Sequence, residues 1–117
     1  MTEVVVCGAG GFIGGHLIAD LRREGRFELR AVDVKPMDEW FQVFDDVDNR
    51  VLDLSERDSC REAVAGSRYI FNLAADMGGM GFIEANKALC MLSVLINTHM
   101  LLAAREEGVE RYFFASS

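Results

Sequence analysis

Short apolar runs alternate with amphipathic segments along most of the chain. Residues 4–7 are apolar and mostly β-branched, which is typical of a strand covered on both faces of a parallel sheet. Residues 12–24 repeat apolar side chains at helical spacing and are followed by Gly25, a residue type that commonly ends helices. The same criteria predict strands at 4–7, 27–33, 50–54, 68–75 and 111–115, and helices at 12–24, 56–65 and 82–107.

This alternation of strands and helices predicts an α/β fold. Strands that are separated by helices pair in parallel through right-handed crossovers. We therefore expect a Rossmann-type, doubly wound parallel sheet of about five strands in the order 3-2-1-4-5, truncated after the fifth strand. Residues 1–117 then form one domain, and Ser55 is expected to cap the helix at 56–65.

A glycine-rich turn joins the first strand to the first helix. Gly8 permits a sharp turn, Gly11 lets a pyrophosphate approach the backbone, and Gly14 lets the helix pack closely on the strand. The helix start offers unpaired N–H groups to phosphates. Asp33 can accept hydrogen bonds from the adenosine ribose and would repel a 2′-phosphate, so the pattern predicts NAD rather than NADP. The alternative is a purely structural turn followed by a strand-end carboxylate.

The least regular stretch is 35–48. It contains the single proline of the chain, Pro36, and three aromatic residues among acidic ones. Trp40, Phe41 and Phe44 lie at roughly helical spacing, and aromatic residues at this spacing usually pack against a core. We favour packing on the sheet over a second interpretation, in which the segment forms a lip over the adenine side of the cofactor.

Composition and charge argue against several classes of function. Half of the 117 residues are hydrophobic and 26% are charged, as in folded globular proteins. The net charge of −7 argues against nucleic acids and anionic membranes as partners. Cys7, Cys60 and Cys90 are odd in number and lack metal-ligand spacing, so we expect reduced thiols, a cytoplasmic protein and no metal. No basic segment precedes the first strand, so no signal peptide is expected.

The helix expected at 82–107 has an uncharged centre. From residue 88 to residue 104 no side chain carries a formal charge if His99 is neutral. This run is shorter than the ~20 residues of a membrane span, so it indicates a helix buried on several sides. One side is expected to face the sheet and another a partner subunit in a homodimer. His16 and His99 lack a cluster of partner residues, so neither is expected to catalyse. His16 is expected to pack or to meet solvent, and His99 to be a satisfied interior or interface histidine rather than a ligand.

Several motifs together resemble the extended short-chain dehydrogenase/reductase family, which contains the nucleotide-sugar epimerases and dehydratases. The matching positions are residues 8–14, Asp33, residues 51–54, residues 71–75 and residues 115–117. The stretch at 71–83, FNLAADMGGMGFI, is more specific and resembles the GDP-mannose 3,5-epimerase branch of that family. The resemblance covers the whole chain, but only the N-terminal third or so of such an enzyme.

The resemblance implies NAD as cofactor and a nucleotide sugar of the GDP-mannose type as substrate. The residues implied to contact the cofactor are Gly8, Gly11, Phe12, Ile13, Gly14, Asp33, Asp53, Leu54, Leu73, Ala74 and Ala75. Asp53 and Leu54 would contact the adenine. Leu73 and Ala74 would line the nicotinamide side. Gly78 would lie against the substrate, and Ser117 would hydrogen-bond a sugar hydroxyl near the catalytic base.

Some positions depart from the pattern of the family. Cys7 stands where the family usually has Thr, and Ser93 where it usually has Asn. The catalytic Tyr and Lys of the family are four residues apart, and neither Tyr69 nor Tyr112 is followed by Lys at that spacing. We therefore expect the cofactor-binding part of an enzyme that oxidises, epimerises and re-reduces a nucleotide sugar. The alternatives are a non-catalytic NAD-binding sensor or assembly module, and a truncated or split reading frame.

Overall fold

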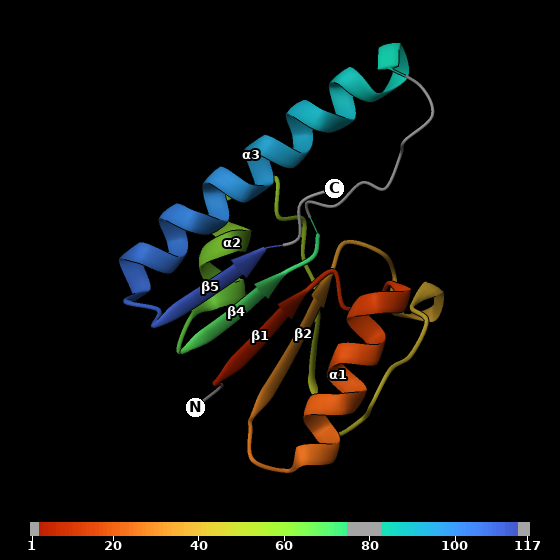
Figure 1. Ribbon diagram of the computed structural model, residues 1–117, viewed down its shortest axis with the longest axis vertical. Coiled ribbons are helices and arrows are strands. Elements are labelled where there is room, and N and C mark those ends of the chain that lie inside the picture. The colour runs from red at the N-terminus through yellow and green to blue at the C-terminus, as the bar shows by residue number, and fades with distance from the viewer. Residues whose placement is uncertain (1–2, 75–82, 115–117) are drawn as a thin grey trace.

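Strands and helices alternate along the chain. The computed structural model describes residues 3–74 and 83–114, with side chains described for 3–74 and 95–113. Within these residues the elements follow one another as β1 (Val4–Cys7), α1 (Phe12–Glu24), β2 (Leu29–Asp33), the short 3-10 helix η1 (Met37–Glu39), β3 (Asp48–Val51), α2 (Arg57–Val64), β4 (Tyr69–Asn72), α3 (Ile83–Glu107) and β5 (Arg111–Phe114) (Figure 1).

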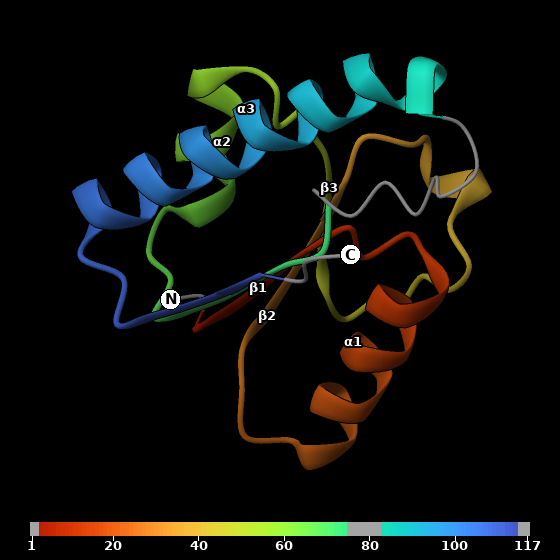
Figure 2. The same cartoon turned by 45° about the horizontal axis from the view of Figure 1, so that its top comes forward.

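The strands of the described residues form one parallel sheet. Its order is β3-β2-β1-β4-β5, which confirms the predicted order. Figure 2 shows α1 on one face of the sheet and α2 and α3 on the other. Each face has its own apolar core: Val5 and Cys7 of β1 belong to the core beside α2 and α3, whereas Val4 and Val6 belong to the core beside α1. Burial on both faces explains why β1 is apolar throughout.

The register of the sheet brings the carboxyl ends of the central strands to one rim. Cys7, the last residue of β1, lies opposite Val32 of β2 and Asn72 of β4. The glycine turn that follows β1, Asp33 at the end of β2 and the residues after β4 therefore share this rim. Ligands of such sheets bind at this rim, beside the strand where the order reverses.

The boundaries of the elements differ from the prediction mainly around β3. The strand spans Asp48–Val51 rather than 50–54, so Asp53 and Leu54 lie beyond its end. The N-cap of α2 is Glu56, which makes no side-chain hydrogen bond to the helix. Ser55 instead donates its N–H and its hydroxyl to the Asp53 carboxylate. The prediction that Ser55 caps α2 is wrong, because the helix begins one residue later and this hydroxyl turns back to Asp53.

A buried arginine ties the edge of the sheet to α2. The Arg30 guanidinium of β2 donates to the carbonyl oxygens of Glu62, Ala63 and Ala65, at 3.2, 2.8 and 3.0 Å. These are carbonyl groups at the C-terminal end of α2, where the helix itself supplies no donors. Arg30 also pairs with Asp48 of β3 at 3.1 Å, and its side chain is only 8% exposed. One side chain thus holds β2, β3 and α2 together.

Two of the three cysteines are buried free thiols. Cys7 and Cys60 lie in the core beside α2 and α3, as expected from their apolar contexts. The Cys60 thiol donates to the Leu54 carbonyl oxygen at 3.1 Å, and burial raises the pKa of Cys60 to about 11. Burial also raises the pKa of Cys7. Both thiols therefore stay protonated and unreactive near neutral pH. The side chain of Cys90 lies outside the described residues.

Replacing Arg30 with Met is expected to lower the free energy of unfolding by about 2–4 kcal/mol, because α2 and Asp48 lose a buried charged partner. Urea unfolding followed by circular dichroism measures the change. Arg26→Met is the matched control, since the Arg26 side chain is 73% exposed and its pairing with Glu24 lies on the surface. Arg26→Met should change stability little. Similar losses in the two variants would contradict the role given to Arg30.

Candidate functional site

The turn after β1 begins with a conformation that favours glycine. Gly8 has a φ of +84°, and its N–H donates to the Val32 carbonyl oxygen at 2.7 Å. A Cβ atom at Gly8 would lie 2.8 Å from the carbonyl carbon of Leu73 and 2.9 Å from the nitrogen of Ala74. Glycine is therefore required at position 8 for two reasons: its positive φ, and its close contact with the backbone that follows β4.

The start of α1 packs directly on this turn. A Cβ atom at Gly14 would overlap the carbonyl oxygen of Gly8 and would lie 2.8 Å from the Cα atom of Ala9. Gly11 is different. Its φ is −84°, and a Cβ atom there would meet the Gly8 carbonyl oxygen at 3.5 Å, an ordinary contact. The described residues therefore require glycine at positions 8 and 14 but not at position 11.

The helix start at Gly11 has no side-chain cap among the described residues. Gly11 is the N-cap of α1 and makes no side-chain hydrogen bond, and the first turn of α1 contains no acidic residue. The first N–H groups of a helix have no acceptor within the helix, and the helix dipole adds about half a positive charge there. Ser, Thr or Asp would cap this end better. The bare N–H groups fit the diphosphate of a dinucleotide.

Asp33 holds the turn from the neighbouring strand. One carboxylate oxygen accepts the N–H of Gly10 at 2.9 Å, and the other accepts the N–H of Lys35 at 3.1 Å. Asp33 is buried, with 7% of its surface exposed. Each oxygen has a further lone pair, so the carboxylate can also accept hydrogen bonds from ribose hydroxyls. The bond to Gly10 is a structural role that the sequence did not reveal, and the ribose contact stays a prediction.

The segment that follows β2 folds back over the glycine turn. A Cβ atom at Gly10 would lie 2.7 Å from the Trp40 ring, and Trp40 donates its Nε1–H to the Lys35 carbonyl oxygen at 2.8 Å. The N–H of Phe41 donates to the Gly10 carbonyl oxygen at 2.9 Å. Trp40 belongs to the core beside α1 and the partly buried Phe44 packs against that core, which confirms that these two aromatic residues pack. Phe41, in contrast, is 53% exposed.

Large apolar side chains are exposed at the first turn of α1. Phe12 and Ile13 are 63% and 66% exposed. The Phe12 ring makes edge-to-face contacts with His16 and Phe41, with ring centroids 4.5 and 5.0 Å apart. His16 is exposed and touches two aromatic rings, which agrees with the expectation that it packs or meets solvent. Phe12 and Ile13 lie beside the bare N–H groups, where a ligand of the turn would meet them.

Other predicted contact residues lie beyond β3 and β4. Asp53 is exposed, and hydrogen bonds from the hydroxyl and N–H of Ser55, at 2.6 and 3.0 Å, hold the pKa of Asp53 below its usual value. The Leu54 side chain is 3% exposed and lies in the core, so a contact with adenine would fall to its backbone. Leu73 and Ala74 are partly buried beside the glycine turn.

A buried polar network behind the rim was not predicted. Nδ2 of Asn72 donates to the Tyr112 hydroxyl at 2.8 Å and lies 3.4 Å from Oδ1 of Asn97. The Tyr112 hydroxyl donates to Oδ1 of Asn97 at 2.7 Å, and burial raises the pKa of Tyr112. These residues come from β4, β5 and α3. The only signals in the sequence were a tyrosine inside a strand and an asparagine inside an apolar helix.

Some predicted positions lie outside the described residues, namely Ala75, Gly78, Ser117 and the side chain of Ser93. His99 Nδ1 is buried and has no hydrogen-bond partner in the described part of the chain. Across residues 3–74 and 83–114 as described, no group of three His, Cys, Asp or Glu residues could hold a metal ion. The helices of the same residues include none that is long and apolar enough to cross a membrane.

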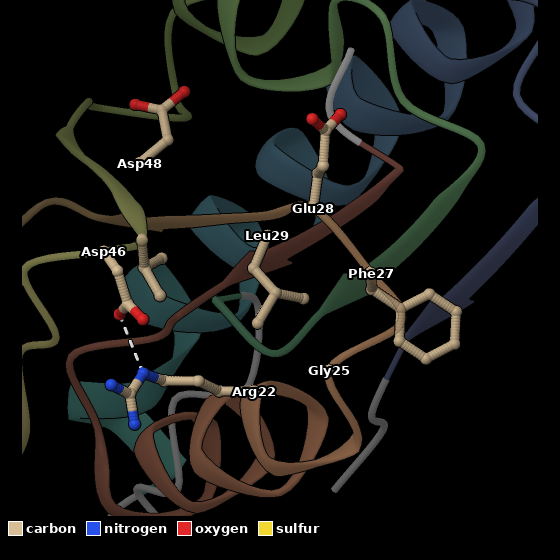
Figure 3. Close-up of a pocket in the computed structure, with 8 residues that line it drawn as sticks. Arg22, Gly25, Phe27, Glu28, Leu29, Asp46 and Asp48 are labelled. Carbon is tan, nitrogen blue, oxygen red and sulfur yellow. Dashed lines mark hydrogen bonds and ion pairs between the residues drawn. The ribbon is translucent and has the colours of Figure 1, made fainter.

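A hollow lies at the end of the sheet opposite the rim (Figure 3). It has a volume of about 420 Å³ and is lined by Arg22, Gly25, Phe27, Glu28, Leu29, Asp46, Val47 and Asp48. Arg22 and Asp46 point toward one another and pair at 2.7 Å. Leu29 and Asp48 are the first residues of β2 and β3, so the hollow lies at the amino ends of these strands. It is therefore separate from the rim that carries the glycine turn.

Comparison with known proteins places the chain in one family. Residues 4–117 match the model of the family described as the NAD dependent epimerase/dehydratase family. GDP-mannose 3,5-epimerase 1 of Oryza sativa subsp. japonica is 41% identical over 116 residues, which cover 98% of this chain and 30% of that protein. The chain thus spans less than a third of the length of this relative.

Solved structures show the same fold with NAD bound. A short-chain dehydrogenase/reductase superfamily protein from Agrobacterium tumefaciens, with bound NAD, matches with a TM-score of 0.79 at 27% identity, over 98% of this chain and 32% of that chain. UDP-glucose 4-epimerase from Thermus thermophilus, in complex with NAD, matches with a TM-score of 0.78 at 25% identity, over 98% of this chain and 37% of that chain.

Gly14→Ala is expected to lower the free energy of unfolding by about 2 kcal/mol or more, because its methyl group would overlap the Gly8 carbonyl oxygen. In an ordinary helix the same change stabilises. Gly11→Ala is the matched control and should cost about 1 kcal/mol or less, since its methyl group meets only an ordinary contact. Urea unfolding measures both. A Gly14→Ala variant as stable as the unaltered protein would contradict the close packing of α1 on the turn.

Proposed function

Because the chain belongs to the NAD dependent epimerase/dehydratase family, we propose that it binds NAD on the rim formed by the glycine turn, Asp33 and the end of β4. We propose further that it forms the cofactor-binding part of an enzyme that epimerises a nucleotide sugar of the GDP-mannose type. The similarity to a GDP-mannose 3,5-epimerase supports this substrate class, and the similarity to structures with bound NAD supports the cofactor.

The bare start of α1 is the observation that carries the proposal. A purely structural turn would need glycine at positions 8 and 14, where a Cβ atom collides with backbone, but not at position 11. Glycine at position 11 supplies no side-chain cap to the helix start and places no side chain of its own beside the first N–H groups. Asp33 lies next to these groups through its bond to Gly10. Together they match a diphosphate with a ribose beside it.

The position of β1 in the sheet suggests how the dinucleotide lies. Asp33 is on the β2 side of the glycine turn, and the peptide between Leu73 and Ala74 is on the β4 side. A dinucleotide that crosses such a rim has its adenosine on one side and its nicotinamide on the other. Bound NAD would supply the acceptor of hydride for oxidation of a sugar hydroxyl. Substrate contacts by Gly78 and Ser117 are part of the proposal.

The described residues contain no phenol suited to act as a general base. Tyr112 is engaged with Asn72 and Asn97, and burial raises its pKa, whereas a phenolate base needs a lowered pKa near neutral pH. Neither Tyr112 nor Tyr69 has Lys four residues later. We therefore propose that these 117 residues bind the cofactor without completing the reaction. The same observation favours a second function, a NAD-binding sensor or assembly module.

The outer side of α3 offers a surface to a second copy of the chain. Leu95, Leu101 and Leu102 are 41%, 46% and 48% exposed on this helix. Exposed leucines on one helix commonly mark a surface that another protein covers. A homodimer that packs through α3 is therefore part of the proposal.

Isothermal titration calorimetry of the purified protein is expected to show binding of NAD and about tenfold or more weaker binding of NADP. The reason is repulsion between a 2′-phosphate and the Asp33 carboxylate. Gly11→Ala should weaken NAD binding while the protein stays folded, because a methyl group at the helix start would leave the diphosphate less room beside the first N–H groups of α1. A folded protein that fails to bind NAD would refute the proposed cofactor site.

The protein of 117 residues, mixed with NAD and GDP-mannose, is expected to show no epimerisation when the sugar is followed by nuclear magnetic resonance. Turnover by a preparation free of longer protein would contradict this expectation. Binding of GDP-mannose to the NAD-loaded protein would support the enzyme. Binding of NAD alone, with no affinity for GDP-mannose, would favour the sensor or assembly module.

A further inference from the structure

The network of Asn72, Tyr112 and Asn97 ends on the backbone of the rim. Oδ1 of Asn72 accepts the N–H of Ala74 at 3.1 Å. The N–H of Leu73 donates to the Cys7 carbonyl oxygen at 2.8 Å, which continues the pairing of β4 with β1. The peptide between Leu73 and Ala74 is therefore held at both ends, by the sheet through residue 73 and by the network through residue 74.

Gly8 holds the same peptide from the side of the glycine turn. The carbonyl carbon of Leu73 and the nitrogen of Ala74 would lie 2.8 and 2.9 Å from a Cβ atom at Gly8, so the peptide is in close contact with this glycine. Rotation of the peptide would break its bond to Asn72, and a shift toward β1 would bring it into collision with Gly8. Its orientation is thus fixed by three independent contacts.

Stability alone does not explain a polar network at this place. Asn72 is fully buried, and the surrounding core beside α2 and α3 is built from aliphatic side chains such as Ile70, Ile96 and Met100. Burial of polar groups in such a layer is costly, and apolar side chains often serve the fold as well or better. A closed network adds something that apolar packing does not, namely one defined direction for the polar groups bonded to it.

We propose that Asn72, Tyr112 and Asn97 are positioning residues that set the Leu73–Ala74 peptide against the nicotinamide end of the bound dinucleotide. The inference rests on the proposed NAD site, in which the β4 side of the glycine turn receives the nicotinamide half. The hydrogen bonds of the network described above join β4, β5 and α3, and none of them involves Asp33 or the first turn of α1. Its loss should therefore affect only ligands that carry a group on the β4 side of the turn.

Calorimetric titration of Tyr112→Phe with NAD and with ADP-ribose tests the inference. ADP-ribose keeps the adenosine, the diphosphate and the second ribose but lacks nicotinamide. Tyr112→Phe removes the hydroxyl that links Asn72 to Asn97, so NAD is expected to bind roughly threefold to tenfold more weakly, as for the loss of one supporting hydrogen bond. The affinity for ADP-ribose should change by less than about twofold. Asn97→Ala is a second variant with the same expected pattern.

Tyr69→Phe is the matched control. It also removes one hydroxyl, from the first residue of β4, but this tyrosine packs against the core beside α1. Both affinities should stay unchanged in this variant. Urea unfolding of each variant separates a loss of folded protein from a loss of affinity.

The outcomes separate the inference from the proposed function. Equal weakening of NAD and ADP-ribose in Tyr112→Phe and Asn97→Ala would indicate a merely structural network and would overturn the inference, as would unchanged NAD affinity in both variants. Selective weakening of NAD supports it. Should Tyr112→Phe fail to fold, the result with Asn97→Ala decides. Failure of the unaltered, folded protein to bind either ligand would refute the proposed NAD site, and the inference with it.

Discussion

The candidate site depends on one close approach, that of the first turn of α1 to the backbone of the turn after β1. Gly14 lies so near the Gly8 carbonyl oxygen that no side chain fits between them. From the neighbouring strand, Asp33 accepts the N–H of Gly10 and fixes the middle of the same turn. The N–H groups at the helix start are therefore held in place by the fold itself. Donors that are already ordered cost little conformational entropy when an anion binds to them.

Local signals explain most of what could be predicted from the sequence. Gly25 was expected to end the helix at 12–24, and it has a φ of +72°, a conformation that other residues rarely adopt. The apolar run at 4–7 indicated a doubly covered strand because burial depends on the side chains themselves. The order of the strands could be predicted because the crossover connections between parallel strands are right-handed. The helix end and the buried strand needed only residues that are close in the chain, and the strand order needed only the sequence of elements.

Partners that are distant in the chain could not be predicted in the same way. Arg30 lies 32 to 35 residues from the carbonyl groups that it binds, and no periodic pattern connects them. From the sequence, the Ser55 hydroxyl could bond either to the start of α2 or to Asp53. Only the folded chain shows that it donates to the Asp53 carboxylate. The strand at Asp48–Val51 is mostly charged or polar and partly exposed, so its alternation was too weak to fix its start. Tertiary contacts decided these cases.

The residues of the rim differ in how clearly they can report on a ligand. Asp33 both accepts the N–H of Gly10 and faces the expected ribose, so a substitution there disturbs the turn and the ligand contact at once. Substitutions of Gly8 and Gly14 are ambiguous in the same way, because the backbone requires glycine at both positions with or without a ligand. The backbone does not require glycine at position 11. Tyr112 lies on β5, and β4 separates this strand from β1 and the turn that follows it. If a substitution of Gly11 or of the Tyr112 hydroxyl weakens binding and leaves the protein folded, the loss therefore reports on the ligand contact and not on the fold.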